Sequence, residues 1–366
     1  MSPALTSADG LPLAIDLEPL VQRVLDAAKA AGATQAEAGL SHSRGYSVSV
    51  RKSEVESLEF QRDRDLSLTV YFGKRKGSAS TGDLSDSGIR QAVEAAVAIA
   101  QVTEEDPCSG LADADRLATV FPDLQLDHYW DLQPAQAVEL ARACEAAAMA
   151  VDSRITQTEG AGLSTQRGVS LYANSHGFVG RRSGTQHSIS CAVIATDANG
   201  NMQRDYWYDG GRDARTFDSP EAIGRRAGER TIARLGARRL STRTAAVLFV
   251  PQTARSLFGH FIGAISGGSL YRRASFLLDH LDKPVFAPQI TLEQRPFLLG
   301  ASSSSAFDHE GVATSDRTLV ENGVLRGWLL GSYSARKLGL QTTGNAGGVF
   351  NLLVSHGAHD YASLLR

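Results

Sequence analysis

The sequence predicts an α+β protein in which antiparallel sheets have helices packed on one side. Apolar and polar residues alternate in several short segments that are bounded by turn residues, as in half-buried antiparallel strands; segment 66–72 is the clearest example. Segments with the apolar spacing of helices flank two groups of such strands, at 17–31 and 85–101 and again at 135–151 and 220–235. This repeated order of helix, strands and helix favours α+β units over a parallel sheet with alternating helices.

We expect the first unit to span 15–106, after a loose start at 1–14. Its opening helix has a plausible stop at Gly32. Strands are expected at 36–41, 46–51 and 66–72, with a turn near Arg44-Gly45 between the first two. The second helix has Ser85 or Asp86 near its cap.

The second unit is expected at 107–240. We expect residues 107–133 to form an irregular segment that crosses from the first unit to the second, called the crossing segment below. A helix and four short strands are expected after it, at 135–151, 155–160, 168–174, 187–196 and 202–208. Asn199-Gly200 is a strong signal for a hairpin between the last two strands. Helix, strands and helix thus occur twice, which we interpret as a weak internal repeat.

The third unit is expected at 241–366. A buried hydrophobic strand at 245–250 leads into an amphipathic helix at 254–264, which stops at Ser266-Gly267-Gly268. Farther on, Asn322-Gly323 predicts a hairpin, and 332–338 predicts a short helix.

The composition describes an ordinary globular chain. It has 366 residues, of which 42% are hydrophobic and 21% charged, enough for two or three domains with a sizeable core. The net charge of −3 gives no overall basic field, so we expect neither nucleic acid nor an anionic membrane as a partner.

Cysteine usage and hydropathy predict a cytoplasmic protein. The three cysteines, Cys108, Cys144 and Cys191, are far apart and odd in number, which favours reduced, buried thiols. No apolar run approaches the roughly 20 residues that span a bilayer. Residues 1–13 lack the basic start and apolar centre of a signal peptide.

Several long motifs resemble the PmbA/TldD family, a bacterial and archaeal group that includes a two-part cytosolic metalloprotease. The family's N-terminal domain is similar to VSVRKSEVESLEFQRDRDLSLTVYFGKRKGSAST at 48–81, and its C-terminal domain to FDHEGV at 307–312 and SYSARKL at 332–338. The central family helix resembles RSLFGHFIGAISGG at 255–268. The resemblance covers nearly all of 36–348.

The resemblance implies a subunit without zinc. In the family's catalytic subunit the central helix carries His-Glu-x-x-x-His; here the first His falls on Gly259, the Glu on His260 and the second His on Ala264. A catalytic zinc needs about three protein ligands, and one imidazole does not supply them. The implied protein is therefore a PmbA (TldE)-like subunit with no cofactor of its own. Its expected partner is a TldD-like subunit that holds zinc.

For such a heterodimer the resemblance implies proteolysis and peptide maturation, with unfolded or extended peptides as substrates. His260, Gly267 and Gly268 are then candidates for contact with a peptide or with the partner. A structural histidine and glycines needed for packing explain these residues equally well. At 308–310, Asp308, His309 and Glu310 are neighbours whose side chains are expected to project in different directions, which argues against a metal site there.

Two other functions stay open. The first is that of a regulatory protein-binding module, in line with the older description of the family as modulators of DNA gyrase. The second is that of a self-sufficient metallopeptidase, in which the chain holds a metal with unusual ligands such as His260, His280 and His309. Family members also continue past the position where this chain stops, so exposed sheet edges and apolar surface are expected.

Overall fold

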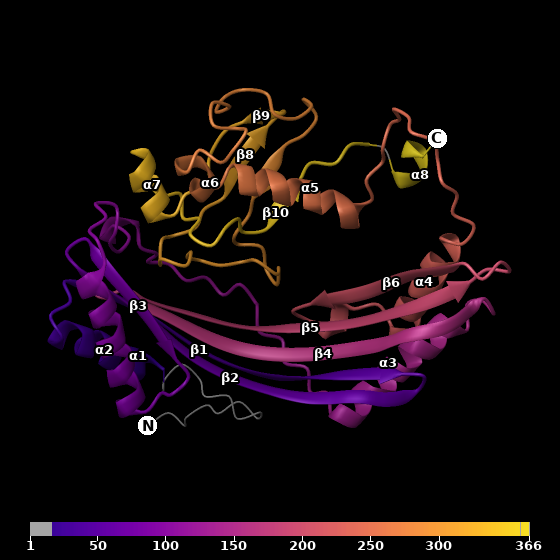
Figure 1. The fold of residues 1–366 in the computed structure, drawn as a ribbon, viewed down its shortest axis with the longest axis horizontal. Helices are drawn as coiled ribbons and strands as arrows, with labels where there is room; N and C mark the ends of the chain where they lie inside the picture. Colours follow the sequence, from indigo (N-terminus) through magenta and orange to yellow (C-terminus); the bar gives the residue numbers. More distant parts are fainter. Residues whose placement is uncertain (1–16, 359, 366) are drawn as a thin grey trace.

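The N-terminal two-thirds of the chain form one long, curved, antiparallel sheet (Figure 1). The structure is a computed structural model that describes residues 17–358 and 360–365; the expected loose start at 1–14 lies outside them. The sheet order is β3-β2-β1-β4-β5-β6. Its strands are β1 (Gln35–Arg51), β2 (Glu54–Phe72), β3 (Arg75–Thr81), β4 (Ile155–Asn174), β5 (Val179–Thr196) and β6 (Met202–Gly211).

Four helices accompany this sheet, two in each half: α1 (Glu18–Ala30), α2 (Asp86–Val102), α3 (Pro134–Met149) and α4 (Pro220–Ala233). Each half has the order helix, three strands, helix, and β1 pairs with β4 where the halves meet. The weak internal repeat is thus present in the topology. The two strand groups, expected in separate units, join in a single sheet.

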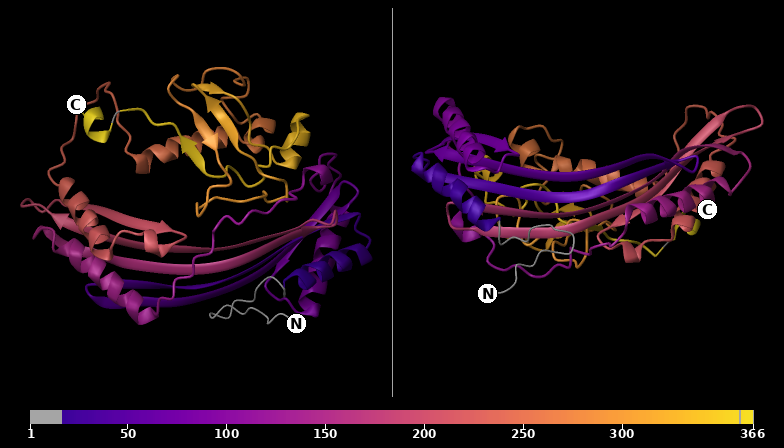
Figure 2. Two further views of the ribbon diagram at one scale, coloured as in Figure 1. Left: turned by 180° about the vertical axis from the view of Figure 1, so that it is seen from behind. Right: turned by 90° about the horizontal axis from the view of Figure 1, so that it is seen from below.

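All four helices lie on the convex face of the sheet (Figure 2). Alternate side chains of β1 are buried there because successive residues of a strand point to opposite faces. Ala38 and Leu40 pack with α1 and α2, and Val48 and Val50 pack with α3 and α4. The expectation of helices on one side of an antiparallel sheet is confirmed, and the concave face is left for other contacts.

The turn expected near Arg44-Gly45 is wrong, because β1 runs straight through it. A Cβ on Gly45 would lie 2.1 Å from the carbonyl oxygen of Thr165 on β4. The glycine therefore serves close approach of two strands and does not mark a turn. Strands 155–160 and 168–174 likewise fuse into β4, which absorbs two register shifts near Gly160.

The C-terminal unit lies over the concave face (Figure 1). It contains helices α5 (Pro251–Ala264), α6 (Gly267–Tyr271), α7 (Ser332–Leu338) and α8 (Tyr361–Leu364). Its four-stranded sheet has the order β10-β7-β8-β9, from β7 (Leu292–Gln294), β8 (Arg317–Glu321), β9 (Val324–Leu325) and β10 (Leu352–Val354). Phe261, Ala264 and Ile265 of the α5 region pack against this sheet. No helix of the described chain has the length and hydropathy to cross a bilayer.

Two sequence expectations fail at the entrance to this unit. Residues 245–250 form no strand, and Val247 has 69% of its surface exposed. Apolar β-branched and aromatic residues form a strand only when a neighbour pairs with it, and no such neighbour exists among the described residues. Helix α5 does end at Ala264, but Gly267 and Gly268 then begin α6 instead of terminating a helix.

Two partly buried arginines fasten the C-terminal unit to the rest of the chain. Arg182 of β5 donates to the carbonyl oxygens of Phe307 and Asp308, the latter at 3.0 Å. Arg336 of α7 donates to the carbonyl oxygens of Gly110 (3.0 Å) and Leu111 (2.6 Å) in the irregular crossing. A guanidinium group can donate hydrogen bonds to several carbonyl oxygens at once in a fixed geometry. These contacts therefore hold the C-terminal unit in a fixed position relative to the large sheet.

Candidate functional site

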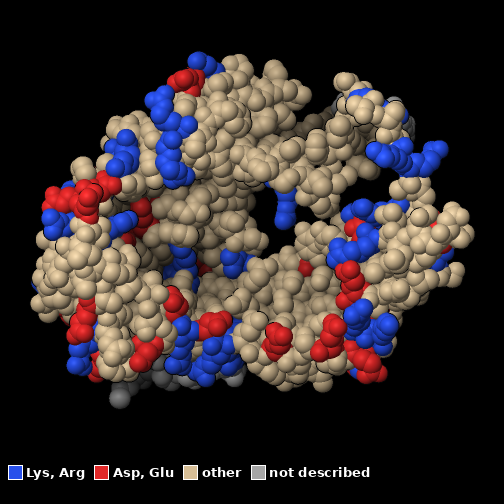
Figure 3. All heavy atoms as spheres, viewed as in Figure 1, with Lys and Arg blue, Asp and Glu red and all other residues tan. Residues whose placement is uncertain are grey.

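A hollow separates the C-terminal unit from the concave face of the sheet (Figure 3). The strand residues on this face alternate with the buried ones and are mostly small and polar. Ser164 of β4 and Ser188 of β5 share a hydrogen bond of 2.8 Å between their hydroxyl groups. Further residues of this floor are Ser41, Ser43 and Ser47 of β1, Asp63 and Asp65 of β2, Ser170 of β4 and Ser190 of β5. The floor therefore offers many hydrogen-bonding groups, most of them on small side chains.

A pair of tyrosines stands on the β6 side of the hollow. The rings of Tyr206 and Tyr208 are stacked, with centroids 6.2 Å apart, and the residues are 46% and 40% exposed. Arg255 of α5 donates to the Tyr208 hydroxyl at 3.5 Å, so α5 and the sheet meet here. Trp207 lies on the convex face beneath the Arg226 and Arg230 guanidinium groups of α4. The aromatic run 206–208 thus divides into a surface pair and a structural tryptophan.

The three positions that match the family's zinc motif carry one imidazole and differ in exposure. Gly259 is exposed, and a Cβ there would meet no atom within 4 Å. His260 is exposed, whereas Ala264 is buried in the core of the C-terminal unit. Only Gly259 and Gly263 leave open space beside α5.

The donor set for a metal is missing as well. The part of the chain that the structure describes contains no group of three His, Cys, Asp or Glu residues arranged to hold a metal ion. His260, His280 and His309 are all described, and the structure does not bring them together as one ligand set. They lie on α5, on the segment after α6 and on a loop against the large sheet, respectively.

Gly267 and Gly268 line a groove of about 460 Å³ beside α6. A Cβ on Gly267 would lie 2.2 Å from the Ser334 hydroxyl oxygen of α7, so this glycine is required for packing within the chain. Gly268 has more room, with Arg272 side-chain atoms 3.4 Å from such a Cβ. Glu310 borders the groove and accepts a 2.8 Å hydrogen bond from the Ser332 backbone N–H.

Asp308 ties together the two loops that form the opposite wall of this groove. One carboxylate oxygen accepts the backbone N–H groups of Glu310 (2.8 Å) and Val312 (3.0 Å), and the other accepts that of Ala346 (2.8 Å). The side chain is completely buried, and this burial raises the pKa of Asp308 to about 6. Because His309 is exposed and Glu310 binds Ser332, the three neighbours do project in different directions.

A smaller pocket of about 200 Å³ lies where the loop of Asp308 meets the large sheet. Tyr172 lines it and donates to Glu37 at 2.6 Å, while Tyr71 donates to the other carboxylate oxygen at 2.8 Å. Burial raises the pKa of Glu37 despite these hydrogen bonds. Sequence patterns gave no signal for this pairing, because the three residues come from β1, β2 and β4.

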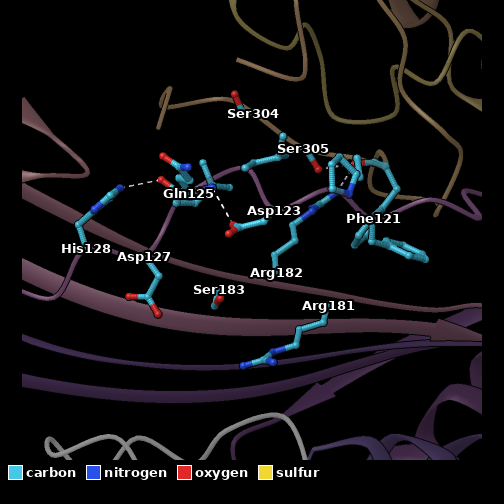
Figure 4. Close-up of a pocket in the computed structure, with 15 residues that line it drawn as sticks. Phe121, Asp123, Gln125, Asp127, His128, Arg181, Arg182, Ser183, Ser304 and Ser305 are labelled. Atoms are coloured by element: carbon cyan, nitrogen blue, oxygen red, sulfur yellow. Dashed lines mark hydrogen bonds between the residues drawn. The ribbon is translucent and has the colours of Figure 1, made fainter. Parts of the chain in front are cut away.

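A third groove, of about 410 Å³, runs along the part of β5 that lies beyond the end of β6 and has no strand partner on that side (Figure 4). Figure 4 shows Arg182 directed toward the loop of Phe307 and Arg181 on the other side of the strand. The crossing segment forms the outer wall, held by an internal hydrogen bond of 2.8 Å between the His128 ring and the Gln125 carbonyl. Its Leu126 carbonyl accepts the Thr185 backbone N–H at 2.9 Å. The crossing segment therefore covers this exposed strand edge.

Comparison with protein families agrees with this architecture. Residues 36–100 match domain 1 of the PmbA/TldA metallopeptidases, residues 127–235 match the central domain, and residues 242–366 match the C-terminal domain. The large sheet and its helices correspond to the first two domains, and the unit above the hollow corresponds to the third.

Individual relatives extend this match over most of the chain. The metalloprotease PmbA of Escherichia coli O157:H7 is 46% identical over 331 residues, which are 90% of this chain and 73% of the relative. A PmbA homologue of Haemophilus influenzae is 44% identical over 93% of this chain and 75% of its own length. The chain belongs to the PmbA/TldA metallopeptidase family.

Solved structures show the same fold. A putative modulator of DNA gyrase from Bacteroides thetaiotaomicron superposes with a TM-score of 0.90 at 26% identity, over 96% of this chain and 79% of that one. TldE from Thermococcus kodakarensis superposes with a TM-score of 0.79 at 18% identity, over 94% and 80%. At the lower identity the likeness concerns the fold alone.

Proposed function

We propose that this chain is the non-catalytic, zinc-less PmbA/TldE-like subunit of a cytoplasmic metalloprotease. Its partner is a TldD-like subunit that supplies zinc and the base for peptide hydrolysis, and unfolded or extended peptides are its substrates. The observation that carries the proposal is helix α5. At the positions of the family's zinc motif it presents an open glycine, one exposed histidine and an alanine buried in the core.

The residues present do not fit a zinc ion. Ala264 has no donor atom, Gly259 has no side chain, and His260 alone cannot replace a set of about three ligands. No hydrolytic step is therefore assigned to this chain. Its own contribution is to hold the peptide, and the hollow supplies suitable chemistry for that task.

The floor of the hollow suits an extended peptide of varied sequence. Serine hydroxyls along β1, β4 and β5 can hydrogen-bond to peptide backbone groups without selecting a side chain. The stacked Tyr206 and Tyr208 offer an apolar surface with a polar rim, and Arg204 lies beside Tyr206 with its guanidinium 5.8 Å from the ring centre. The open strip at Gly259 and Gly263 lets a backbone approach α5 closely.

Reconstitution tests this function directly. The chain and a TldD-like subunit are purified separately and assayed on an unfolded, fluorescently labelled polypeptide, alone and mixed in equal amounts. We expect no cleavage by this chain alone and cleavage by the mixture. Size-exclusion chromatography should show the two proteins eluting together. Cleavage by this chain alone, or a mixture no more active than the TldD-like subunit by itself, contradicts the proposal.

A further inference from the structure

A pair of tyrosines lines the groove beside α6. This is the groove of about 460 Å³ that Gly267 and Gly268 border, and Tyr271 of α6 and Tyr333 of α7 are part of its wall. The two rings meet edge to face, with centroids 5.8 Å apart. The volume is within the range of about 300–1,000 Å³ that is usual for ligand sites. Figure 1 shows α6 and α7 above the β3 end of the large sheet, across the hollow from β6.

Cationic side chains surround this tyrosine pair. The Arg272 guanidinium lies 5.2 Å from the centre of the Tyr271 ring and donates to the Tyr271 hydroxyl at 3.2 Å. The ammonium groups of Lys76 on β3 and Lys337 on α7 lie 5.7 Å and 5.3 Å from the centre of the Tyr333 ring. The large sheet therefore contributes one of these cations, and the C-terminal unit contributes the other two.

The cations outnumber the acidic groups around the groove. Lys337 forms an ion pair with Asp106 at 3.0 Å. Arg272 and Lys76 form no ion pair within the part of the chain that the structure describes. Glu310 on the opposite wall adds a second negative charge. These five side chains thus carry three positive charges against two negative charges, and the surplus favours an anionic group in the groove.

Arg272 is placed to bind a carboxylate at the rim of the groove. Both terminal nitrogens of its guanidinium lie 3.4 Å from the position that a Cβ on Gly268 would take, so a larger residue at 268 would crowd them. The Arg272 side chain is exposed, which leaves its remaining N–H groups open to a ligand. A guanidinium matches the two oxygens of a carboxylate with parallel hydrogen bonds.

The rest of the groove suits the end of an extended chain. Ile262 of α5 gives an apolar contact, and a Cβ on Gly263 would meet no atom within 4 Å. One Glu310 oxygen accepts the Ser332 backbone N–H, and the other lies 3.4 Å from the place of a Cβ on Gly331, at the groove wall. This second oxygen can accept a backbone N–H from a bound peptide. A peptide C-terminus carries such an N–H close to a carboxylate.

We propose that this groove binds the C-terminal carboxylate of the peptide that the hollow holds, with the carboxylate bound by Arg272 and attracted by Lys76. The inference rests on the proposed peptide-holding role and adds a preference for a free C-terminus. A chain end held on the β3 side also sets the direction in which the peptide crosses the hollow.

Fluorescence anisotropy tests the assignment on the full chain without a partner subunit. The probe is a short unfolded peptide that is labelled at its N-terminus and made in two forms, one with a C-terminal carboxylate and one with a C-terminal amide. We expect the carboxylate form to bind about tenfold more tightly, because it alone can make the charge-assisted pair with Arg272. Arg272→Gln should abolish this preference and leave the affinity for the amide form unchanged. Lys76→Gln should reduce the preference about threefold, because it removes only a nearby charge.

Arg273→Gln is the matched control. Arg273 is the next residue, equally charged and exposed, but its guanidinium stacks on neither tyrosine ring, so its variant should keep the preference. The ratio of two affinities in one variant cancels any general effect on folding. Equal affinities for the two forms in the unaltered chain, or equal losses of preference in the Arg272 and Arg273 variants, would overturn the assignment and leave the peptide-holding role intact. If neither form binds, the assignment and the peptide-holding role fail together.

Discussion

Replacing Asp308 by Ala should lower the free energy of unfolding by about 3–5 kcal/mol. The change leaves three backbone N–H groups without an acceptor: that of Val312, which is buried, and those of Glu310 and Ala346, which are partly buried. Each such loss costs about 1–3 kcal/mol, and the two loops beside α6 lose their common anchor. Urea denaturation followed by tryptophan fluorescence measures the effect.

Asp316→Ala is the control for this experiment. Asp316 is in the same unit and forms an ion pair with Arg295 at 2.8 Å, but its side chain is 51% exposed. Exposed ion pairs contribute about 0–1 kcal/mol, so this variant should unfold close to the original chain. Equal losses in both variants would show that Asp308 has no special role in holding the loops.

The same carboxyl group predicts a pH dependence. The folded-state pKa of Asp308 is about 6, above its ordinary value of 3.8, so the folded chain binds this proton more tightly than the unfolded chain. Its stabilising contribution is therefore fully present below about pH 4 and is lost as the pH rises through about 6. A shift of about two units corresponds to about 3 kcal/mol.

The difference in unfolding free energy between the original chain and Asp308→Ala, measured at pH 4 and pH 7, isolates this contribution. Other carboxylates titrate in both proteins and cancel in the difference. The difference should be larger at pH 4. An unchanged difference would mean that folding does not raise the pKa of Asp308.

Replacing Tyr206 and Tyr208 together by Ala should lower kcat/KM of the reconstituted heterodimer about tenfold on an unfolded polypeptide. Each aromatic contact contributes about 0.5–1.5 kcal/mol, and removal of both tyrosines deletes the apolar platform at the edge of the hollow. Both residues are at least 40% exposed, so the fold should tolerate the change. Initial rates over a range of substrate concentrations give the value.

Tyr129→Ala is the matched control, since Tyr129 is also exposed but lies against Arg167, whose side chain is on the convex face of the sheet. This variant should cleave the polypeptide at the original rate. If the double variant also retains full activity, the peptide does not use the tyrosine platform and the proposed path through the hollow is wrong.

Much of the fold follows from local sequence patterns. The amphipathic helices α1, α2, α3 and α4 lie within a few residues of their predicted positions, because apolar spacing and caps such as Ser85 act within a single helix. The hairpin at Asn199-Gly200 and the hairpin between β8 and β9 form as predicted, since both need left-handed backbone at the glycine.

Features that depend on distant partners could not be predicted in this way. Gly45 looks like a turn residue in the sequence, and only the carbonyl of Thr165 on β4 explains it. The apolar run at 245–250 has the composition of a strand but lacks a pairing neighbour in the described chain. Arg44 of β1 and Arg167 of β4 lie opposite one another only through the register of two strands, although 123 positions (167 − 44) separate them in the sequence.

The zinc content of the isolated chain decides whether this subunit can be catalytic by itself. The protein is purified alone, dialysed without a chelator and measured by plasma mass spectrometry, with a TldD-like subunit treated in the same way for comparison. We expect well below one zinc per chain here and close to one in the TldD-like subunit. Close to one tightly held zinc per chain would contradict it, because a ligand set other than the α5 positions Gly259, His260 and Ala264 would then make this chain an enzyme in its own right.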